Sequence, residues 1–81
     1  MALDPDLRQL VLRFQENEIT EYHIYHRLAA SLPSEENRQI LERIAEDERR
    51  HYEEWKEATE TEVKPNRAKI SRYTFLGRTL G

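Results

Sequence analysis

Apolar side chains recur at steps of three and four residues between Leu7 and Leu32, which is the pattern of one face of an amphipathic α-helix. Asp4-Pro5 marks the start of this helix, because aspartate can cap a helix and proline suits the first helical position. Pro33 marks its end, since the residue before a proline avoids the helical conformation. The positions that form the face are Leu7, Leu10, Val11, Phe14, Tyr22, Tyr25, Leu28, Ala29 and Leu32.

Two glutamates fall on this apolar face and two histidines fall outside it. At 100° per residue, Glu18 lies near the middle of the face and Glu21 lies toward one edge. Glu21 is either an additional metal ligand or a salt-bridge partner. His23 and His26 lie off the face and are interpreted as surface histidines.

A second helix is expected after Ser34, which can cap it, and Lys64-Pro65-Asn66 is expected to end it. Glu48 and His51 lie inside its apolar arc, and Asp47 borders that arc. The apolar positions are Ile40, Leu41, Ile44, Tyr52, Trp55 and Ala58. Aromatic residues on both faces, namely Tyr22, Tyr52 and Trp55, are interpreted as core packing.

A shorter third helix, with apolar positions from Ile70 to Leu80, is expected to run to Gly81. The predicted fold is therefore all-α: an antiparallel two-helix hairpin and a short C-terminal helix. Residues 1–63 would form the hairpin with its metal ligands, and residues 64–81 a basic amphipathic helix or linker.

The short connection around Pro33 predicts which residues of the two helices face one another. Counted from the centre of the turn, Glu18 lies about 15 residues before it, Glu48 about 15 after it and His51 about 18 after it. The three side chains are therefore expected at nearly one height on facing stripes. Two buried carboxylates would repel each other, and a cation between them removes the repulsion. An imidazole nitrogen beside them favours iron or manganese over calcium.

One hairpin supplies two glutamates and one histidine, which is half of a two-metal ligand set. Di-iron carboxylate bundles use one Glu from each of two helices and Glu-x-x-His from each of the other two. A homodimer with two-fold symmetry, or a higher homo-oligomer with an even number of chains, would supply this set and form a four-helix bundle that holds two iron ions. A following pair of helices outside this sequence is the alternative way to complete it.

The segments QENEITEY (15–22) and DERRHY (47–52), together with Tyr25, resemble the rubrerythrin branch of the ferritin-like superfamily. The chain is most similar to the N-terminal half of the ferritin-like domain that precedes the membrane domain in vacuolar-iron-transporter-type proteins of prokaryotes. The resemblance covers roughly residues 7–60 and extends weakly through 75–81.

This resemblance implies that Glu18, Glu48 and His51 are iron ligands. It also implies that Asp47 holds a ligand histidine by a hydrogen bond and that Tyr25 lies near the metals. The implied function is Fe(II) oxidation for iron storage, detoxification or delivery to a transporter. Complete domains of this type have a second Glu and a second Glu-x-x-His, and true rubrerythrins also have rubredoxin-like cysteines; this sequence has neither.

Two other function classes remain open on the sequence alone. One is a metal-sensing domain that binds iron or manganese without turnover, and the other is a helical dimerisation module whose glutamates are protonated or paired with arginine. A Glu-x-x-His pair also arises by chance in a glutamate-rich chain, so its position in the apolar stripe is what favours the metal site.

Composition narrows these choices further. The absence of cysteine excludes disulfides, zinc-thiolate sites and iron–sulfur clusters. Residues 1–63 contain all 16 acidic residues, whereas residues 64–81 contain five Lys or Arg and no acid. The basic segment suits an anionic partner, such as a membrane surface or an acidic neighbour, or it is simply a solvated basic helix, while the acidic body disfavours nucleic acid. The resemblance adds a membrane iron-transporter domain as a partner for residues 64–81. We therefore expect a cytoplasmic location, either free or at the inner face of a membrane, and a chain that is either a fragment of a longer protein or packs its tail on a partner.

Overall fold

The computed structural model describes residues 3–80, which form three α-helices: α1 (Pro5–Ser31), α2 (Glu35–Thr59) and α3 (Arg67–Leu80). This confirms the all-α prediction, and the described residues contain no β-strand. Gly81, the predicted end of the third helix, lies outside the described residues. None of the three helices combines the length and the apolar character that crossing a bilayer requires.

The helix ends follow the sequence signals in part. Pro5 occupies the first turn of α1 as predicted, but Asp4 makes no side-chain capping hydrogen bond. The Ser34 hydroxyl does cap α2, by accepting a hydrogen bond of 3.3 Å from the backbone N–H of Asn37. The prediction that α2 continues to Lys64-Pro65-Asn66 is wrong, because α2 ends at Thr59 and Glu60 adopts the left-handed conformation, with φ 54°.

The segment from residue 60 to residue 66 leaves α2 early because polar side chains of α1 bind it. Arg8 donates a hydrogen bond to the Thr61 hydroxyl (2.6 Å), and Gln15 Nε2 donates to the Thr61 carbonyl oxygen (2.8 Å). Farther along, the Asn66 backbone N–H donates to the Thr20 hydroxyl (3.0 Å). Gln15 and Thr20 are almost fully buried, so these bonds satisfy polar groups that would otherwise be costly to bury.

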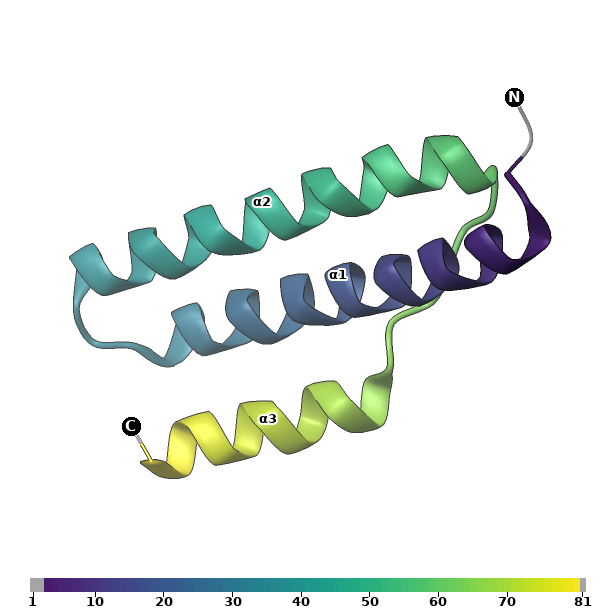
Figure 1. The fold of residues 1–81 in the computed structure, drawn as a ribbon. Helices are drawn as coiled ribbons and strands as arrows, with labels where there is room; N and C mark the ends of the chain where they lie inside the picture. Colours follow the sequence, from purple (N-terminus) through teal and green to yellow (C-terminus); the bar gives the residue numbers. More distant parts are fainter. Residues whose placement is uncertain (1–2, 81) are drawn as a thin grey trace.

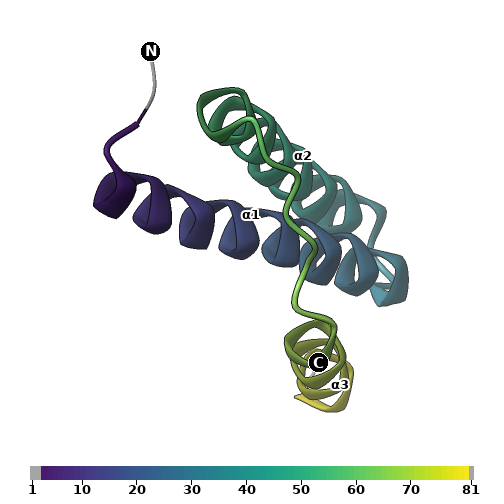
Figure 2. The same ribbon diagram turned by 90° about the vertical axis from the view of Figure 1, so that its right-hand side faces the viewer.

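α1 is the central helix of the molecule. α2 packs antiparallel along one side of it, and α3 packs on the opposite side (Figures 1 and 2). The connection after α2 crosses α1 before α3 begins (Figure 1). At Gly77, α3 approaches α1 so closely that a Cβ atom there would overlap the Leu28 side chain.

The three helices form one flat layer, with principal dimensions of 46 × 23 × 14 Å. Their radius of gyration is 14.3 Å, whereas a compact domain of this length would have about 12 Å. The buried apolar residues are few and several are small: Val11, Ile24, Ala29, Ala45, Tyr52 and Ile70. A single layer of helices leaves its broad faces without a second layer to cover them.

One broad face of the α1–α2 hairpin carries large apolar side chains that remain exposed. We call it the open face and define it by Leu7, Leu10, Phe14, Ile40, Ile44 and Trp55, each between 36% and 47% exposed. The Phe14 and Trp55 rings pack across the two helices, with centroids 5.8 Å apart. Trp55 was predicted as a core residue, and this prediction is wrong, because its side chain is exposed on the open face.

Candidate metal centre

Glu18, Glu48 and His51 converge between α1 and α2. His51 Nδ1 lies 3.2 Å from Glu18 Oε2 and 3.8 Å from Glu48 Oε1. One potential ligand atom from each residue lies within 4.8 Å of the other two. Ligands about 2.1 Å from a shared ion lie roughly 3 to 4 Å from one another, so small rotations of these side chains would enclose a metal.

Each helix contributes to this group through a simple spacing. Glu48 and His51 are three residues apart and therefore occupy one face of α2. Glu18 follows Phe14 by one helical turn on α1, as Glu48 follows Ile44 on α2. The short turn between the helices sets the register that brings the two faces to the same height, as predicted. The group thus lies within the open face, between its apolar residues.

The three side chains are neither fully buried nor free in solvent. The exposed fractions are 22% for Glu18, 19% for Glu48 and 44% for His51. The carboxylates are the more enclosed part, and the imidazole lies toward the open side. A cation could therefore reach the site from solvent.

Glu21 lies beside the pair of glutamates, and its pKa is strongly raised. Burial raises its pKa from 4.5 to about 7, and a hydrogen bond with Glu48 and the negative charge of Glu48 contribute to the increase. The pKa of Glu48 is also raised, mainly by burial and then by the neighbouring Glu18, although the Glu21 hydrogen bond opposes this. A proton held by Glu21 and donated to Glu48 thus removes part of the repulsion in the metal-free chain.

Tyr25 and Asp47, the two residues predicted to support the ligands, occupy different positions relative to the cluster. Burial, followed by the charges of Glu21 and Glu48, raises the pKa of the Tyr25 phenol, so this side chain lies near the carboxylates. Asp47 instead pairs with Arg50 at 3.2 Å on the surface of α2. Its predicted hydrogen bond to a ligand histidine stays a prediction.

The remaining histidines lie apart from the cluster. His26 is 54% exposed and pairs with Glu42 at 3.1 Å across α1 and α2. The pKa of His23 is lowered, first by burial and then by the positive charge of Arg27. The Tyr22 ring stacks on the His26 ring, with centroids 5.8 Å apart. These contacts agree with the interpretation of His26 as a surface histidine, whereas His23 is half-buried between α1 and the start of α3.

The donor set fits a first-row transition metal better than calcium. Two carboxylates and one imidazole are hard to borderline ligands of the kind that iron, manganese and zinc accept, whereas calcium prefers six to eight oxygen ligands. Three protein ligands leave coordination positions open for solvent, substrate or ligands from another chain.

No protein-family model matches this chain, and neither curated proteins nor solved structures show a significant match to it.

Proposed function

We propose that this protein is half of a ferritin-like di-iron centre, that two copies pair through their open faces, and that the dimer binds and oxidises Fe(II). Each copy would supply Glu18, Glu48 and His51. Two copies would then supply four glutamates and two histidines to two iron ions, in a four-helix bundle built from two hairpins. The purpose would be iron storage, detoxification or delivery to a transporter.

The observation that carries this proposal is the position of a metal-ligand cluster within an uncovered apolar face. Glutamates at such positions are costly unless a cation or a proton neutralises them. A two-fold axis through the open face would bring both clusters together and cover the apolar side chains that surround them. One symmetric contact would thus complete the ligand set and the core at the same time.

The solvent-accessible surface of the chain is larger than that of a typical folded monomer, and this supports pairing with a second copy. A folded monomer of 9.8 kDa is expected to expose about 5,200 Å², whereas this chain exposes 6047 Å². The difference, roughly 850 Å², is close to the ~800 Å² that each partner buries in a standard protein–protein interface. The open face supplies apolar area of the kind that such an interface needs.

In the proposed reaction, iron is the substrate and the side chains bind it and manage charge. Two ferrous ions lose one electron each, and dioxygen accepts both electrons with two protons to give hydrogen peroxide. Glu18 and Glu48 balance the increasing charge of the iron, and His51 supplies a neutral nitrogen ligand. Glu21 holds a proton near neutral pH and can release it when cations occupy the site.

The proton shared by Glu21 and Glu48 also favours a rival function, a helical dimerisation module without metal. In that case protonation alone neutralises the glutamates, and the open faces pair as an ordinary apolar interface. A metal sensor, which binds iron or manganese without turnover, is the third candidate. Metal content and oxidation rate distinguish the three.

The test is metal analysis of the purified full chain at a measured oligomeric state, after anaerobic loading with Fe(II) and then exposure to air. The site variant is Glu48→Ala/His51→Ala. The matched control is Glu42→Ala/His26→Ala, which removes the same residue types from an exposed pair that also bridges α1 and α2.

One iron per chain in a dimer, lost in the site variant and kept in the control, supports the proposed centre, and rapid loss of Fe(II) in air supports oxidation. Stoichiometric metal without faster oxidation would indicate a sensor. A dimer that takes up no metal would overturn the metal centre and leave the dimerisation module.

A further inference from the structure

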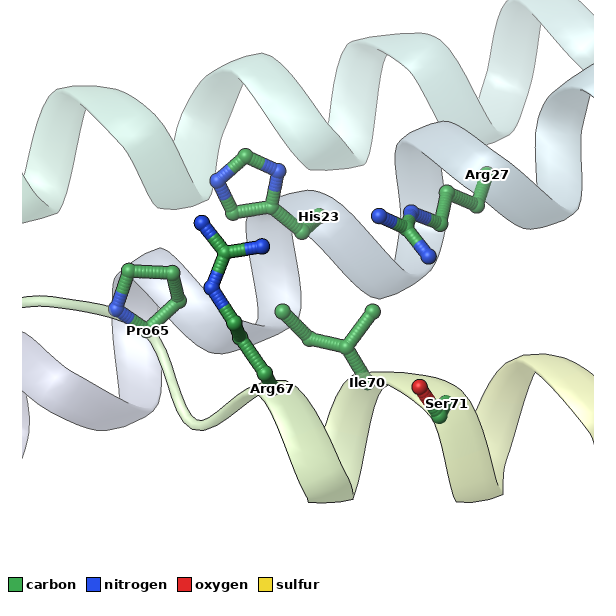
Figure 3. Close-up of a pocket in the computed structure, with 6 residues that line it drawn as sticks. All are labelled: His23, Arg27, Pro65, Arg67, Ile70 and Ser71. Carbon is green, nitrogen blue, oxygen red and sulfur yellow. The ribbon is translucent and has the colours of Figure 1, made fainter.

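A small basic pocket lies between α1 and the start of α3, away from the candidate metal centre. His23, Arg27, Pro65, Arg67, Ile70 and Ser71 line it, and its volume is about 210 Å³ (Figure 3). Ile70, which is buried, and Pro65 form apolar parts of the lining. The polar groups come from both helices, so the packing of α3 on α1 creates the pocket.

Positive groups converge on this space without a carboxylate among them. The guanidinium group of Arg67 on α3 lies beside the His23 ring, and that of Arg27 on α1 points toward the same space from the other side (Figure 3). Their positive charges, together with burial as the largest cause, lower the pKa of His23. None of the lining residues is acidic, and neither arginine takes part in an ion pair with the described residues.

The arginines of the hairpin differ in whether a carboxylate pairs with them, and Arg8, Arg13, Arg43 and Arg49 also lack an ion pair with the described residues. Arg38 and Arg50 each pair with a carboxylate on their own helix. The chain has more acidic than basic residues overall, so carboxylate partners are abundant. Two arginines from different helices that share one space without such a partner leave several N–H donors available to an anion.

The donor geometry suits a tetrahedral oxyanion. Guanidinium groups bind phosphate oxygens through pairs of N–H donors, and the Ser71 hydroxyl adds a single donor. Arg67 is the first residue of α3, so the positive end of the helix dipole also lies at this edge of the pocket. The volume exceeds that of several water molecules, each about 30 Å³ in the liquid, so a hydrated phosphate group fits.

We propose that the pocket formed by His23, Arg27, Arg67 and Ser71 binds a phosphate group, either inorganic phosphate or the phosphomonoester headgroup of an anionic lipid. Both ligands present a tetrahedral dianion with the same recognition chemistry. The proposal does not depend on the metal centre, because none of the four residues belongs to it. It also assigns a specific role to part of the basic segment 64–81.

The test is calorimetric titration of the metal-free full chain with inorganic phosphate at constant ionic strength. Because metal is absent, the outcome is independent of the proposed oxidation. Arg27→Gln and Arg67→Gln should each weaken binding roughly tenfold, the effect of losing one charge-assisted contact of about 1.4 kcal/mol. Arg67→Lys should retain part of the affinity, since lysine keeps the positive charge but lacks the paired N–H donors of the planar guanidinium group.

Two matched controls remove one positive charge from the same helices outside the pocket: Arg13→Gln on α1 and Arg72→Gln on α3, both exposed. Each should change the affinity less than twofold. Circular dichroism of every variant would verify that the helices remain, which is expected because Arg27 and Arg67 are themselves exposed.

A parallel arm distinguishes the two sources of phosphate. Sedimentation with vesicles of phosphatidylcholine containing phosphatidic acid is compared with vesicles of phosphatidylcholine alone. Binding of inorganic phosphate that depends on both arginines assigns the site to the free ion. Binding only to the phosphatidic acid vesicles, with the same dependence, assigns it to a headgroup. No binding in either arm, or binding that Arg13→Gln and Arg72→Gln weaken as much as the pocket variants, would overturn the proposal.

Discussion

Replacing Glu21 with glutamine should stabilise the metal-free protein above neutral pH and leave it nearly unchanged in mild acid. The reason is that burial beside Glu48 holds the pKa of Glu21 at about 7 in the folded chain, against 4.5 in the unfolded chain. Glutamine keeps an N–H donor for Glu48 but has no charge to desolvate.

The sign follows from proton binding. Between about pH 4.5 and 7 the folded state binds more protons at Glu21 than the unfolded state does, so the free energy of unfolding falls as the pH rises through this window and then levels off. The full shift corresponds to about 3.4 kcal/mol at 1.36 kcal/mol per pH unit. Because solvent reaches this half-buried carboxyl, we reduce the expected difference to about 1–2 kcal/mol.

The assay is urea unfolding followed by circular dichroism, with a chelator present, at about pH 5 and about pH 8 and at one protein concentration. Glu16→Gln, an exposed position on the same helix, is the control for the loss of one charge. A difference of about 1–2 kcal/mol between Glu21→Gln and wild type at the higher pH, small at the lower pH, is expected. The same difference at both pH values would refute the reasoning, because it would show that Glu21 ionises alike in the folded and unfolded chains.

Three further substitutions test the packing. The Cβ added by Gly77→Ala overlaps the Leu28 side chain, so the effect of this substitution on the free energy of unfolding should be more favourable in a Leu28→Ala background than in wild type, by about 1 kcal/mol or more. A coupling energy near zero in a double-mutant cycle measured by thermal unfolding would contradict that contact. Thr74→Val should stabilise the protein by about 1 kcal/mol in urea unfolding, because the Thr74 hydroxyl is buried and has no hydrogen-bond partner among the described residues; a loss of stability would show that the hydroxyl is satisfied. Phe14→Ser on the open face should raise the dimer dissociation constant at least about tenfold in analytical ultracentrifugation, whereas Phe75→Ser, at a position that is 68% exposed on α3, should not; equal effects would argue against pairing through the open face.

The features that could be predicted from the sequence depend on short-range geometry. A periodic apolar stripe fixes which residues share a helix face, and a connection of three residues, Leu32 to Ser34, fixes how two stripes align. Together these rules are sufficient to bring Glu18, Glu48 and His51 to one height. They do not say which part of a stripe is covered: Val11 is 4% exposed while its neighbour Leu10 is 45% exposed.

The features that could not be predicted depend on contacts between distant residues. Lys56 to Glu60 contains no proline or glycine that would stop a helix. α2 ends there at a point where Gln15, 44 residues away in sequence, accepts a hydrogen bond from Thr59 and donates one to the Thr61 carbonyl oxygen. The basic pocket has the same origin, since Arg27 and Arg67 come together only when α3 packs on α1. No local pattern marks either arginine as different from its neighbours.

The flatness of the fold has a consequence for how the proposed function would operate. A single layer of helices with few buried apolar side chains has a small margin of stability, and the glutamates within its open face reduce that margin further. On the proposed function, pairing of two open faces adds the missing second layer, and iron replaces the repulsion between carboxylates with attraction. Anything that binds only the folded state stabilises it by mass action, so iron and the second copy should each raise the unfolding temperature, and each should increase the affinity for the other. Folding, dimerisation and metal binding would then be a single linked equilibrium, because the residues that bind the metal are the ones that the interface has to bury.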